Sequence, residues 1–550
     1  MNRMRSTKTN KEIPIKKIPA SVGSNINARD AVLNRNTDEL VIALCGPIGS
    51  ALHNVATAIS EDLTSRFGYE KVSVIRLSEL IEQNTAPQAH LEGFSQHDAA
   101  NDSAIDGGKV PSGEFVRIEK LIRQGNALRA RYTPSFLAEL AIRTIRLDRQ
   151  QYKNEKSHDG IEPRRVCHII DSIKNDEELK LLRDVYGEMP YVVGVFSPLR
   201  EREESLIARG MTMPEIHDLI DTDSGEEKQF GQTVRKTFPQ SDYFLRLEKR
   251  TQTLLKSKVG RFLDLVFGAT IVTPSHAESA MYAAAAAGGA SACLSRQVGA
   301  AITDSDGNIV STGWNDVPKY LGGLYGDFAV DSQHKDHRCW NFGGKCFNHE
   351  EKDKLAEFLA NTLIDAKLLS RDSFQSTFSA IRENAKLSSL IEFSRSVHAE
   401  MHAILNAGRQ HGRSMIGGSL FVTTYPCHSC ARHIIAAGIK DVYYIEPYKK
   451  SLATKLHGDS ITELEDIKDK VRLLPYEGVA PHRFLNLFLA PEDARKTRDG
   501  KLVRITPKAL HPRNQQTVEA FHELESRVLS AVESKLRALP LEGGNGPKAA

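Results

Sequence analysis

The strongest constraint on how this chain can fold is a set of four side chains that must meet at one point, although they come from two separate stretches. These side chains are His398, Glu400, Cys427 and Cys430. Two cysteines three positions apart can reach one metal ion from the first turn of a helix, where the thiolates also face the positive end of the helix dipole. Residues 399–406 are strongly helix-forming, and the strand-like stretch 419–424 leads into the cysteine pair. The sequence therefore predicts two helices whose N-terminal turns meet at a metal ion.

The residue types indicate zinc and a catalytic role. One imidazole (His398) and two thiolates (Cys427, Cys430) suit a borderline-soft ion, and three protein ligands leave a fourth position for water. Zinc lowers the pKa of such a water towards ~7. Glu400 is then free to move protons, first from the water to a ring nitrogen and later to the departing ammonia.

The spacing H-x-E…P-C-x-x-C is typical of the zinc deaminases, which act on nucleobases. The alternative is a structural zinc site with Glu400 on a solvated face. A C-x-x-C pair alone would favour that alternative. The preceding His-x-Glu, Pro426 at the start of the second helix and the strand before it favour catalysis.

The length of 550 residues exceeds one ordinary core and predicts two or three domains. Apolar runs that alternate with helical stretches in the first half are typical of an α/β domain with a mostly parallel sheet. The predicted division is a disordered basic tail at 1–37, an α/β domain at 38–250, the metal-binding domain at 251–490 with an insertion at about 321–390, and a helical extension with a tail at 491–550.

A glycine-containing loop follows the first apolar run, 39–45, and precedes a helical stretch, which is the setting of a phosphate-binding loop. The residues that would hold phosphate are Gly46, Gly49 and Ser50. The loop departs from a Walker A pattern, because Ala51, Leu52 and His53 stand where Gly, Lys and Ser or Thr belong. Backbone N–H groups could still hold an anion there. Three alternatives stay open: a nucleotide-sensing regulatory domain, a docking domain for a partner or inhibitor, or a scaffold that has lost its function.

The predicted insertion contains a second group of metal-ligating residue types: His337, Cys339, Cys346 and His349. One interpretation is an additional structural zinc site. The other is a glycine-rich loop with incidental histidines, because the spacing matches no standard zinc finger.

Charge and cysteine usage narrow the class of protein. A net charge of +3 gives no global electrostatic case for nucleic-acid binding. Seven cysteines without a disulfide-like framework fit a reducing cytoplasm. No apolar run is long enough to span a bilayer, so no membrane partner is expected.

From residue 277 to about 456 the sequence resembles the deoxycytidylate deaminase branch of the cytidine deaminase superfamily. Beyond the zinc motif, residues 295–300 (SRQVGA) resemble the start of the first strand in that family, and 311–318 (STGWNDVP) resemble its Gly-aromatic-Asn turn. The resemblance implies that Asn315 contacts the sugar or the base and that Arg296 helps to hold phosphate. The alternatives are a turn-capping side chain for Asn315 and a plain surface charge for Arg296.

Over about residues 38–490 the chain is similar to the long bacterial deoxycytidylate deaminases of anti-phage defence (the AvcD or DcdV type). These join a P-loop kinase-like domain to a deaminase domain that is an α/β/α sandwich. The resemblance implies zinc as cofactor, conversion of dCTP and dCMP to dUTP and dUMP, and a homo-oligomer. It also implies an allosteric nucleotide at the N-terminal domain and control by an RNA or protein inhibitor. Arg200 and Arg202 lie where such kinases place lid arginines; solvated helix charges are the alternative.

Two other functions compete with this hypothesis. A deaminase of single-stranded DNA or tRNA needs a positive groove with stacking aromatics, and the near-neutral charge and 7% aromatic content speak against it. A nucleotide-sensing switch protein that uses the deaminase fold as a scaffold would keep its biological effect after Glu400→Ala.

Overall fold

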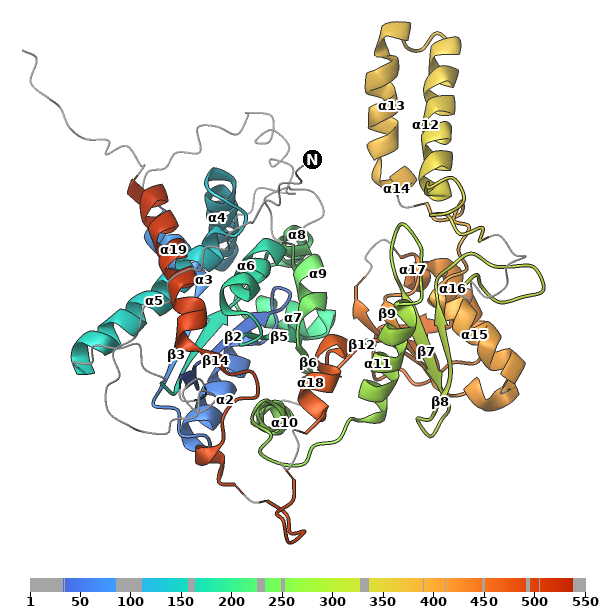
Figure 1. Cartoon of the computed structure of the whole chain (residues 1–550). Helices are drawn as coiled ribbons and strands as arrows, with labels where there is room; N and C mark the ends of the chain where they lie inside the picture. The colour runs from blue at the N-terminus through green and yellow to red at the C-terminus, as the bar shows by residue number, and fades with distance from the viewer. Residues whose placement is uncertain are drawn as a thin grey trace, which may run out of the picture.

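The computed structural model describes twelve stretches of the chain, which form two bodies side by side, each built around a six-stranded sheet (Figure 1). The described residues are 33, 35–85, 111–156, 164–224, 233–248, 253–326, 336–388, 390–410, 412–447, 451–490, 495–503 and 505–537. None of the helices in these stretches combines the length and apolar character needed to cross a bilayer.

The first body contains a sheet in which five neighbouring strands run parallel, as the buried apolar runs predict. A short sixth strand joins one edge antiparallel. In spatial order the strands are β13 (Gly478–Val479), β6 (Tyr243–Arg246), β5 (Tyr191–Phe196), β2 (Leu40–Cys45), β4 (Val166–Asp171) and β3 (Lys71–Arg76).

Helices cover both faces of this sheet. Because successive side chains of a strand point to opposite faces, Val41 and Ala43 of β2 pack under α5, α6 and α19, whereas Leu40 and Ile42 pack under α2 and α10. The helices of this body are α2 (Leu52–Ser65), α3 (Leu77–Asn84), α4 (Gly113–Arg131), α5 (Phe136–Lys156), α6 (Asp176–Tyr186), α7 (Leu199–Ile207), α8 (Met213–Ser224), α9 (Val234–Thr237), α10 (Leu255–Phe267), α18 (Phe484–Phe488) and α19 (Val518–Arg537).

The second body has a mixed sheet. Its strands are, in spatial order, β11 (Ile461–Thr462), β12 (Val471–Pro475), β10 (Asp441–Glu446), β9 (Ser419–Thr424), β7 (Gly299–Thr303) and β8 (Ile309–Trp314). The strands from β11 to β9 are parallel, and β7 and β8 form an antiparallel hairpin. Gly307 lies at the hairpin turn with φ +88°, a conformation that glycine adopts without steric cost.

Helices lie on both faces of the second sheet as well. Helix α11 (His276–Gly288) packs on one face through Ala280 and Ala284. Helices α15 (Ala399–Gln410) and α16 (His428–Ala436) pack on the other face. Short helix α17 (Ala453–Leu456) follows β10. The second body is therefore a three-layered α/β/α arrangement.

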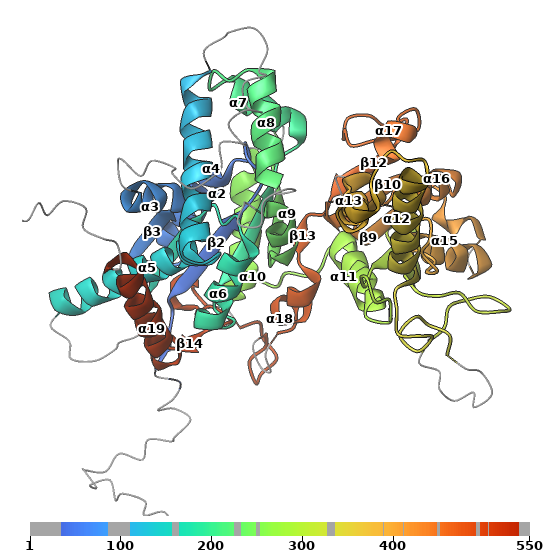
Figure 2. The same ribbon diagram turned by 90° about the horizontal axis from the view of Figure 1, so that it is seen from above.

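The stretch between β8 and α15 contains a helical hairpin that stands away from the second sheet (Figure 1), and Figure 2 views this hairpin along its length. It consists of α12 (Phe347–Asp365) and α13 (Phe374–Glu383), and α14 (Ala385–Ser388) follows it. The insertion predicted at about 321–390 covers this hairpin.

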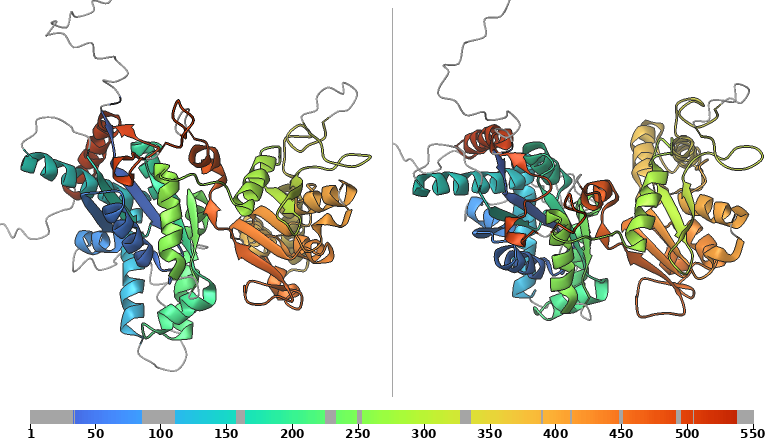
Figure 3. Two further views of the ribbon diagram at one scale, coloured as in Figure 1. Left: turned by 90° about the horizontal axis from the view of Figure 1, so that it is seen from below. Right: turned by 60° about the horizontal axis from the view of Figure 1, so that its bottom comes forward.

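After β12 the chain returns to the first body (Figure 3). Strand β13 extends the first sheet, α19 packs on α5, and β14 (Gln516–Thr517) pairs with β1 (Asn36–Thr37). Buried contacts also join the bodies, because Phe244 lies edge-on to Tyr476 with 5.9 Å between ring centroids. In the order of the chain, the second body is therefore inserted between two parts of the first body.

Candidate active site

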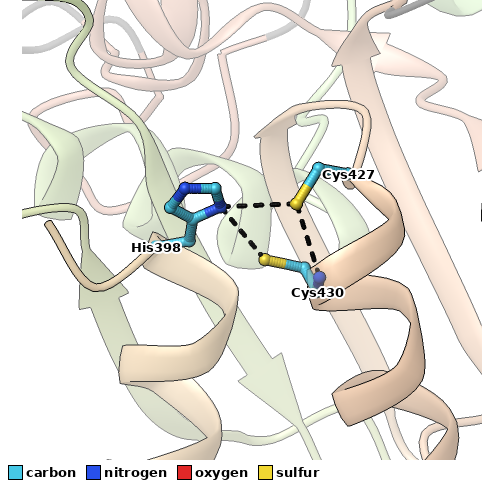
Figure 4. A group of neighbouring side chains, drawn as sticks. All are labelled: His398, Cys427 and Cys430. Carbon is cyan, nitrogen blue, oxygen red and sulfur yellow. Dashed lines mark hydrogen bonds between the residues drawn. The ribbon is translucent and has the colours of Figure 1, made fainter. Parts of the chain in front are cut away.

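The N-terminal turns of α15 and α16 meet, as the spacing predicts, and bring three ligand atoms together (Figure 4). His398 immediately precedes α15, and Cys427 is the residue that caps α16, with its sulfur accepting from the N–H of Cys430 at 3.4 Å. The Nδ1 of His398 lies 3.4 Å from the sulfur of Cys427 and 3.3 Å from that of Cys430. All three donor atoms fall within 4.8 Å of one another.

The donor set fits zinc. Hydrogen bonding, first from Cys430 and then from His398, lowers the pKa of the Cys427 thiol to about 4. The same contact with Cys427 raises the pKa of His398 to about 9. The Cys427 thiol therefore loses its proton easily, and the hydrogen bond with His398 stabilises the charged pair. Zinc binds thiolates and neutral imidazoles, so a zinc ion would take the place of the proton between these two groups.

Glu400 lies in the first turn of α15, only 5% exposed, and is not part of the ligand group. Burial raises the pKa of its carboxyl above the usual range. A carboxyl group in a desolvated setting beside a metal site is suited to accepting and releasing a proton during one reaction.

A cavity of about 260 Å³ opens beside these residues. It is lined by two of the three candidate zinc ligands, His398 and Cys427, and also by Glu400, Asn315 and Arg296. The remaining lining residues are Cys293, Leu294, Ser295, Val298, Cys339, Cys346, Phe347, Asn348, Ile391, Ser394, Arg395, Ser396, Ala399, Thr424 and Tyr425.

Asn315 has a bracing role in addition to lining the cavity. Its Oδ1 accepts from the N–H of Val298 at 2.7 Å, and its Nδ2 donates to the carbonyl of Arg296 at 2.9 Å. The side chain therefore caps the neighbouring backbone, and its contact with the sugar or the base of a substrate stays a prediction. Arg296 forms an ion pair with Glu446.

The four insertion residues do not converge on one point. Cys339 and Cys346 line the cavity, whereas His337 uses its backbone carbonyl to accept from Arg395, and His349 lies in the first turn of α12. Within the described stretches, only His398, Cys427 and Cys430 group their ligand atoms at metal-binding distance. The structure therefore gives this cluster no metal-binding geometry.

The glycine loop lies between β2 and α2, where Gly46, Gly49 and Ser50 were expected to hold phosphate. Gly49 has φ +82°, and a Cβ on Gly46 would stand 2.5 Å from the carbonyl of Val195, so both glycines are needed for the loop. The hydroxyl of Ser50 is buried and has no hydrogen-bond partner among the described residues.

Protein side chains fill this loop. The carboxylate of Asp223, at the end of α8, accepts from the N–H of Ile48 at 2.7 Å. Lys174 bridges that carboxylate, at 2.8 Å, and the carbonyl of Gly46, at 2.7 Å. Arg202 is buried and donates to the carbonyl of Ile48 at 3.2 Å.

Sequence reasoning missed several residues of these two sites. Asp223 and Lys174 are far from the glycine loop along the chain, and nothing in their local sequence marks them. Arg202 is buried rather than a solvated helix charge, whereas the side chain of Arg200 is 73% exposed. Arg395 was also missed, although its place three residues before His398 was a usable signal.

Comparison with known proteins agrees with the geometry of the second body. The family model described as the cytidine and deoxycytidylate deaminase zinc-binding region matches residues 274–446, which include all three ligands. Deoxycytidylate deaminase of Enterobacteria phage T4 is 32% identical over 163 residues, covering 29% of this chain and 72% of that protein. ComE operon protein 2 of Bacillus subtilis is 51% identical over 55 residues, covering 10% of this chain and 29% of that protein.

Among solved structures, the chain is similar to the dCMP deaminase of cyanophage S-TIM5, with 19% identity and a TM-score of 0.21. That match covers 37% of this chain and 99% of the phage protein. The zinc-binding family model and the grouped ligands together confirm zinc as the cofactor of the second body.

Proposed function

Because the chain belongs to the deoxycytidylate deaminase family, we propose that this hydrolytic deaminase acts on free deoxycytidine nucleotides. Its products would be dUTP from dCTP, dUMP from dCMP, and ammonia. The observation that carries the proposal is the meeting of His398, Cys427, Cys430 and the buried Glu400 at one cavity.

The residues of the cavity have separable tasks. When bound by the two thiolates and His398, zinc supplies a Lewis acid that makes a water molecule acidic near neutral pH. Glu400 receives a proton from the attacking water and delivers it to the ring nitrogen. Glu400 then takes the second proton of that water, now on the hydroxyl at C4 of the ring, and gives it to the amino group that leaves as ammonia, so the transfers are sequential. Asn315 holds the backbone of the cavity wall through two hydrogen bonds, and we expect this brace to shape the place where the nucleotide binds.

The test is a substrate panel of dCTP, dCMP, CTP, single-stranded DNA and tRNA, with ammonia release as the readout. We expect turnover of the deoxycytidine nucleotides. In Glu400→Gln we expect turnover to fall by a factor of about 10² to 10⁴ with zinc content unchanged. Glu357→Gln, on the exposed side of α12, is the matched control and keeps its activity.

Two outcomes would reject the proposal. Turnover of a polynucleotide without turnover of any free nucleotide would identify a polynucleotide deaminase instead. Retained biological effect in Glu400→Gln would identify a switch protein with a deaminase scaffold.

For the first body we propose a P-loop kinase-like domain that binds a regulatory nucleotide at its glycine loop. Support comes from the parallel sheet and from the loop between β2 and α2. The carboxylate of Asp223 accepts a hydrogen bond from the N–H of Ile48 in that loop, as a bound anion would. A nucleotide phosphate would replace it and keep Lys174 as its counter-charge. Phosphoryl transfer is not part of the proposal, because Leu52 and His53 supply neither the lysine nor the hydroxyl that it uses.

Displacement of the Asp223 carboxylate by a phosphate can be tested by measuring the binding of dTTP and of inorganic tripolyphosphate by calorimetry. These measurements use the Glu400→Gln variant as the background. Adding Asp223→Asn removes the competing charge, so we expect tighter binding of both ligands. Asp221→Asn, on the same helix and exposed, is the control and leaves affinity unchanged. Equal affinity in the Asp223 and Asp221 variants would exclude the loop as the binding place.

The proposed biological role follows from the resemblance to the long bacterial deoxycytidylate deaminases. We propose nucleotide depletion in anti-phage defence, in the cytoplasm, where reducing conditions keep Cys427 and Cys430 available for zinc. A homo-oligomer and control by an RNA or protein inhibitor stay predictions.

A further inference from the structure

The two bodies meet at a group of charged side chains near the zinc cavity. Arg246, the last residue of β6, forms an ion pair at 3.0 Å with Glu465, which follows β11 in the second body. The side chain of Arg246 is only 8% exposed, and it also pairs with Glu248 at 2.7 Å. In the second body, Arg472 of β12 donates to the carbonyl of Glu465 at 3.0 Å. The end of β6 therefore holds the segment that follows β11.

The same segment also holds one wall of the zinc cavity. Tyr425 lines the cavity two residues before the ligand Cys427. Its hydroxyl donates to Glu463 at 2.7 Å, and Glu463 is only two residues from Glu465. The ring of Tyr425 lies edge-on to Tyr444 of β10, with 4.9 Å between ring centroids. Where Tyr425 lies in the cavity wall therefore depends on Glu463 and Tyr444.

Arg202 links the glycine loop to this contact. It is buried, donates to the carbonyl of Ile48 at 3.2 Å, and packs against Gly49, where an added Cβ would stand 2.9 Å from the Cβ of Arg202. Within the described stretches, the Nε of Arg202 and the hydroxyl of Ser50 are both buried without a hydrogen-bond partner. A buried donor without a partner costs free energy. An anion in the loop that accepts from these groups would remove that cost.

Arg202 also interacts with the second body. Helix α7, which contains Arg202, follows β5, the strand between β2 and β6, so the glycine loop, Arg202 and Arg246 share the carboxyl edge of the first sheet. Burial and then Glu463 raise the pKa of the Tyr444 phenol, whereas Arg246 and Arg202 lower it. Burial lowers the pKa of Arg202, and Asp223 opposes this most strongly. The charge of Arg202 therefore acts both on the loop and on Tyr444.

We propose that Arg202, Tyr444 and Glu463 couple the glycine loop to the zinc cavity, as positioning residues that act through Tyr425. The inference rests on the proposed deamination and on the proposed nucleotide at the loop, and it adds how one controls the other. A phosphate that replaces the Asp223 carboxylate carries more negative charge, so it draws Arg202 towards the loop and away from Tyr444. Glu463 and the Tyr425 hydroxyl that it holds then shift together. The phosphate changes the equilibrium because it binds one of the two arrangements more tightly.

The test measures kcat and KM for dCMP with and without inorganic tripolyphosphate, which offers phosphates but no base. In the wild type we expect tripolyphosphate to change KM by about 5-fold or more, within the usual range of coupling between two sites. Coupling of binding is reciprocal, so dUMP and tripolyphosphate should change each other's affinity by one common factor, as measured by calorimetry.

Two variants interrupt the coupling at different points. Tyr444→Phe removes only the hydroxyl and keeps the ring contact with Tyr425, and Glu465→Gln removes the charge that pairs with Arg246. In both we expect the ratio of KM values with and without tripolyphosphate to fall towards 1. Zinc content, and kcat without tripolyphosphate, stay close to wild type. Asp466→Asn, exposed in the same segment, is the matched control and keeps the wild-type ratio.

A wild-type ratio in both Tyr444→Phe and Glu465→Gln would overturn the proposal, since tripolyphosphate would then act without this contact. Loss of zinc from either variant would also overturn it, because the side chains would then be structural. So would a wild type that binds tripolyphosphate with no change in KM. Should Tyr444→Phe fail to fold, Glu465→Gln decides by the same ratio.

A double-mutant cycle of Asp223→Asn with Tyr444→Phe tests the coupling without any ligand at the loop. We expect their effects on KM not to multiply, and simple multiplication, as for independent sites, would reject the coupling. The cycle decides if tripolyphosphate does not bind, a result that refutes the nucleotide site of the first body. A wild type that turns over no deoxycytidine nucleotide refutes the proposed deamination instead. The cycle is then measured by amide hydrogen exchange of residues 419–427, which reports the local stability of the cavity wall.

Discussion

At the scale of single residues, spacing was enough to predict the chemical centre. His398, Cys427 and Cys430 are close along the chain to the starts of two helices, so local structure almost determines where their side chains point. Arg395 lies three residues before His398, which was a usable signal, but Asp223 had no local signal. Their roles depend on what packs around them, namely Phe342 and Phe347 in one case and the glycine loop in the other.

Asn315 allows a residue-scale prediction, because its two hydrogen bonds can be removed separately. Asn315→Ala removes both and leaves two backbone groups near the cavity without their partners, at a cost of about 1–3 kcal/mol each. Asn315→Asp keeps the oxygen that accepts from Val298 and loses the donation to Arg296. We expect thermal stability to fall in the order wild type, Asp, Ala, with nucleotide KM rising in the same order. An Ala variant with wild-type KM would show that the brace does not shape the cavity.

At the scale of elements, the helix that carries Glu400 is held against a strand by backbone contact. A Cβ on Gly313 of β8 would stand 2.4 Å from the N of Ala403 and 2.5 Å from the carbonyl of Ala399, both in α15. No side chain can occupy that gap, and small residues on both sides let the helix approach the sheet. The parallel strands and helices of both bodies could be predicted from apolar runs, but this close approach could not.

Gly313→Ala is therefore expected to push α15 away from β8 and to move His398 relative to the cysteines. We expect weaker zinc retention during dialysis against a chelator and lower kcat for dCMP. Gly408→Ala on the same helix is the matched control, since no atom lies within 4 Å of its added Cβ. Its stability should rise by about 0.5–1 kcal/mol, because alanine is the better helix former. Equal zinc retention in both variants would contradict the packing argument.

At the scale of the whole molecule, α19 completes the first body. Glu525 of α19 is fully buried, accepts from Arg149 of α5 at 3.1 Å, and accepts from the hydroxyl of Tyr186 at 2.9 Å. Arg149 in turn forms an ion pair with Glu39 beside β2. A network of buried charges thus joins the start of β2 to α19.

Breaking this network should destabilise the first body and not the zinc site. Glu525→Gln leaves Arg149 partly unpaired in the interior, and we expect a loss of about 3 kcal/mol in the free energy of unfolding. Glu533→Gln removes only an exposed pair with Arg537 and should change stability by less than about 0.5 kcal/mol. Thermal unfolding reports the loss of stability, and zinc content reports whether the zinc site of the second body is intact. Together the two measurements show which body the substitution affects. A Glu525 variant as stable as the Glu533 variant would show that α19 is not required.

The sequence by itself determined the reaction centre and the alternation of strands and helices, since both depend on neighbours close along the chain. Ligand spacing on a helix and apolar periodicity are local properties, and they predict the zinc site and the parallel strands. Only the tertiary structure decided that β13 and α19 return to the first sheet, that Asp223 fills the glycine loop, and that Arg395 lines the cavity in contact with Phe342 and Phe347. These features join residues distant along the chain, so they depend on packing and charge compensation that arise only once both bodies have formed.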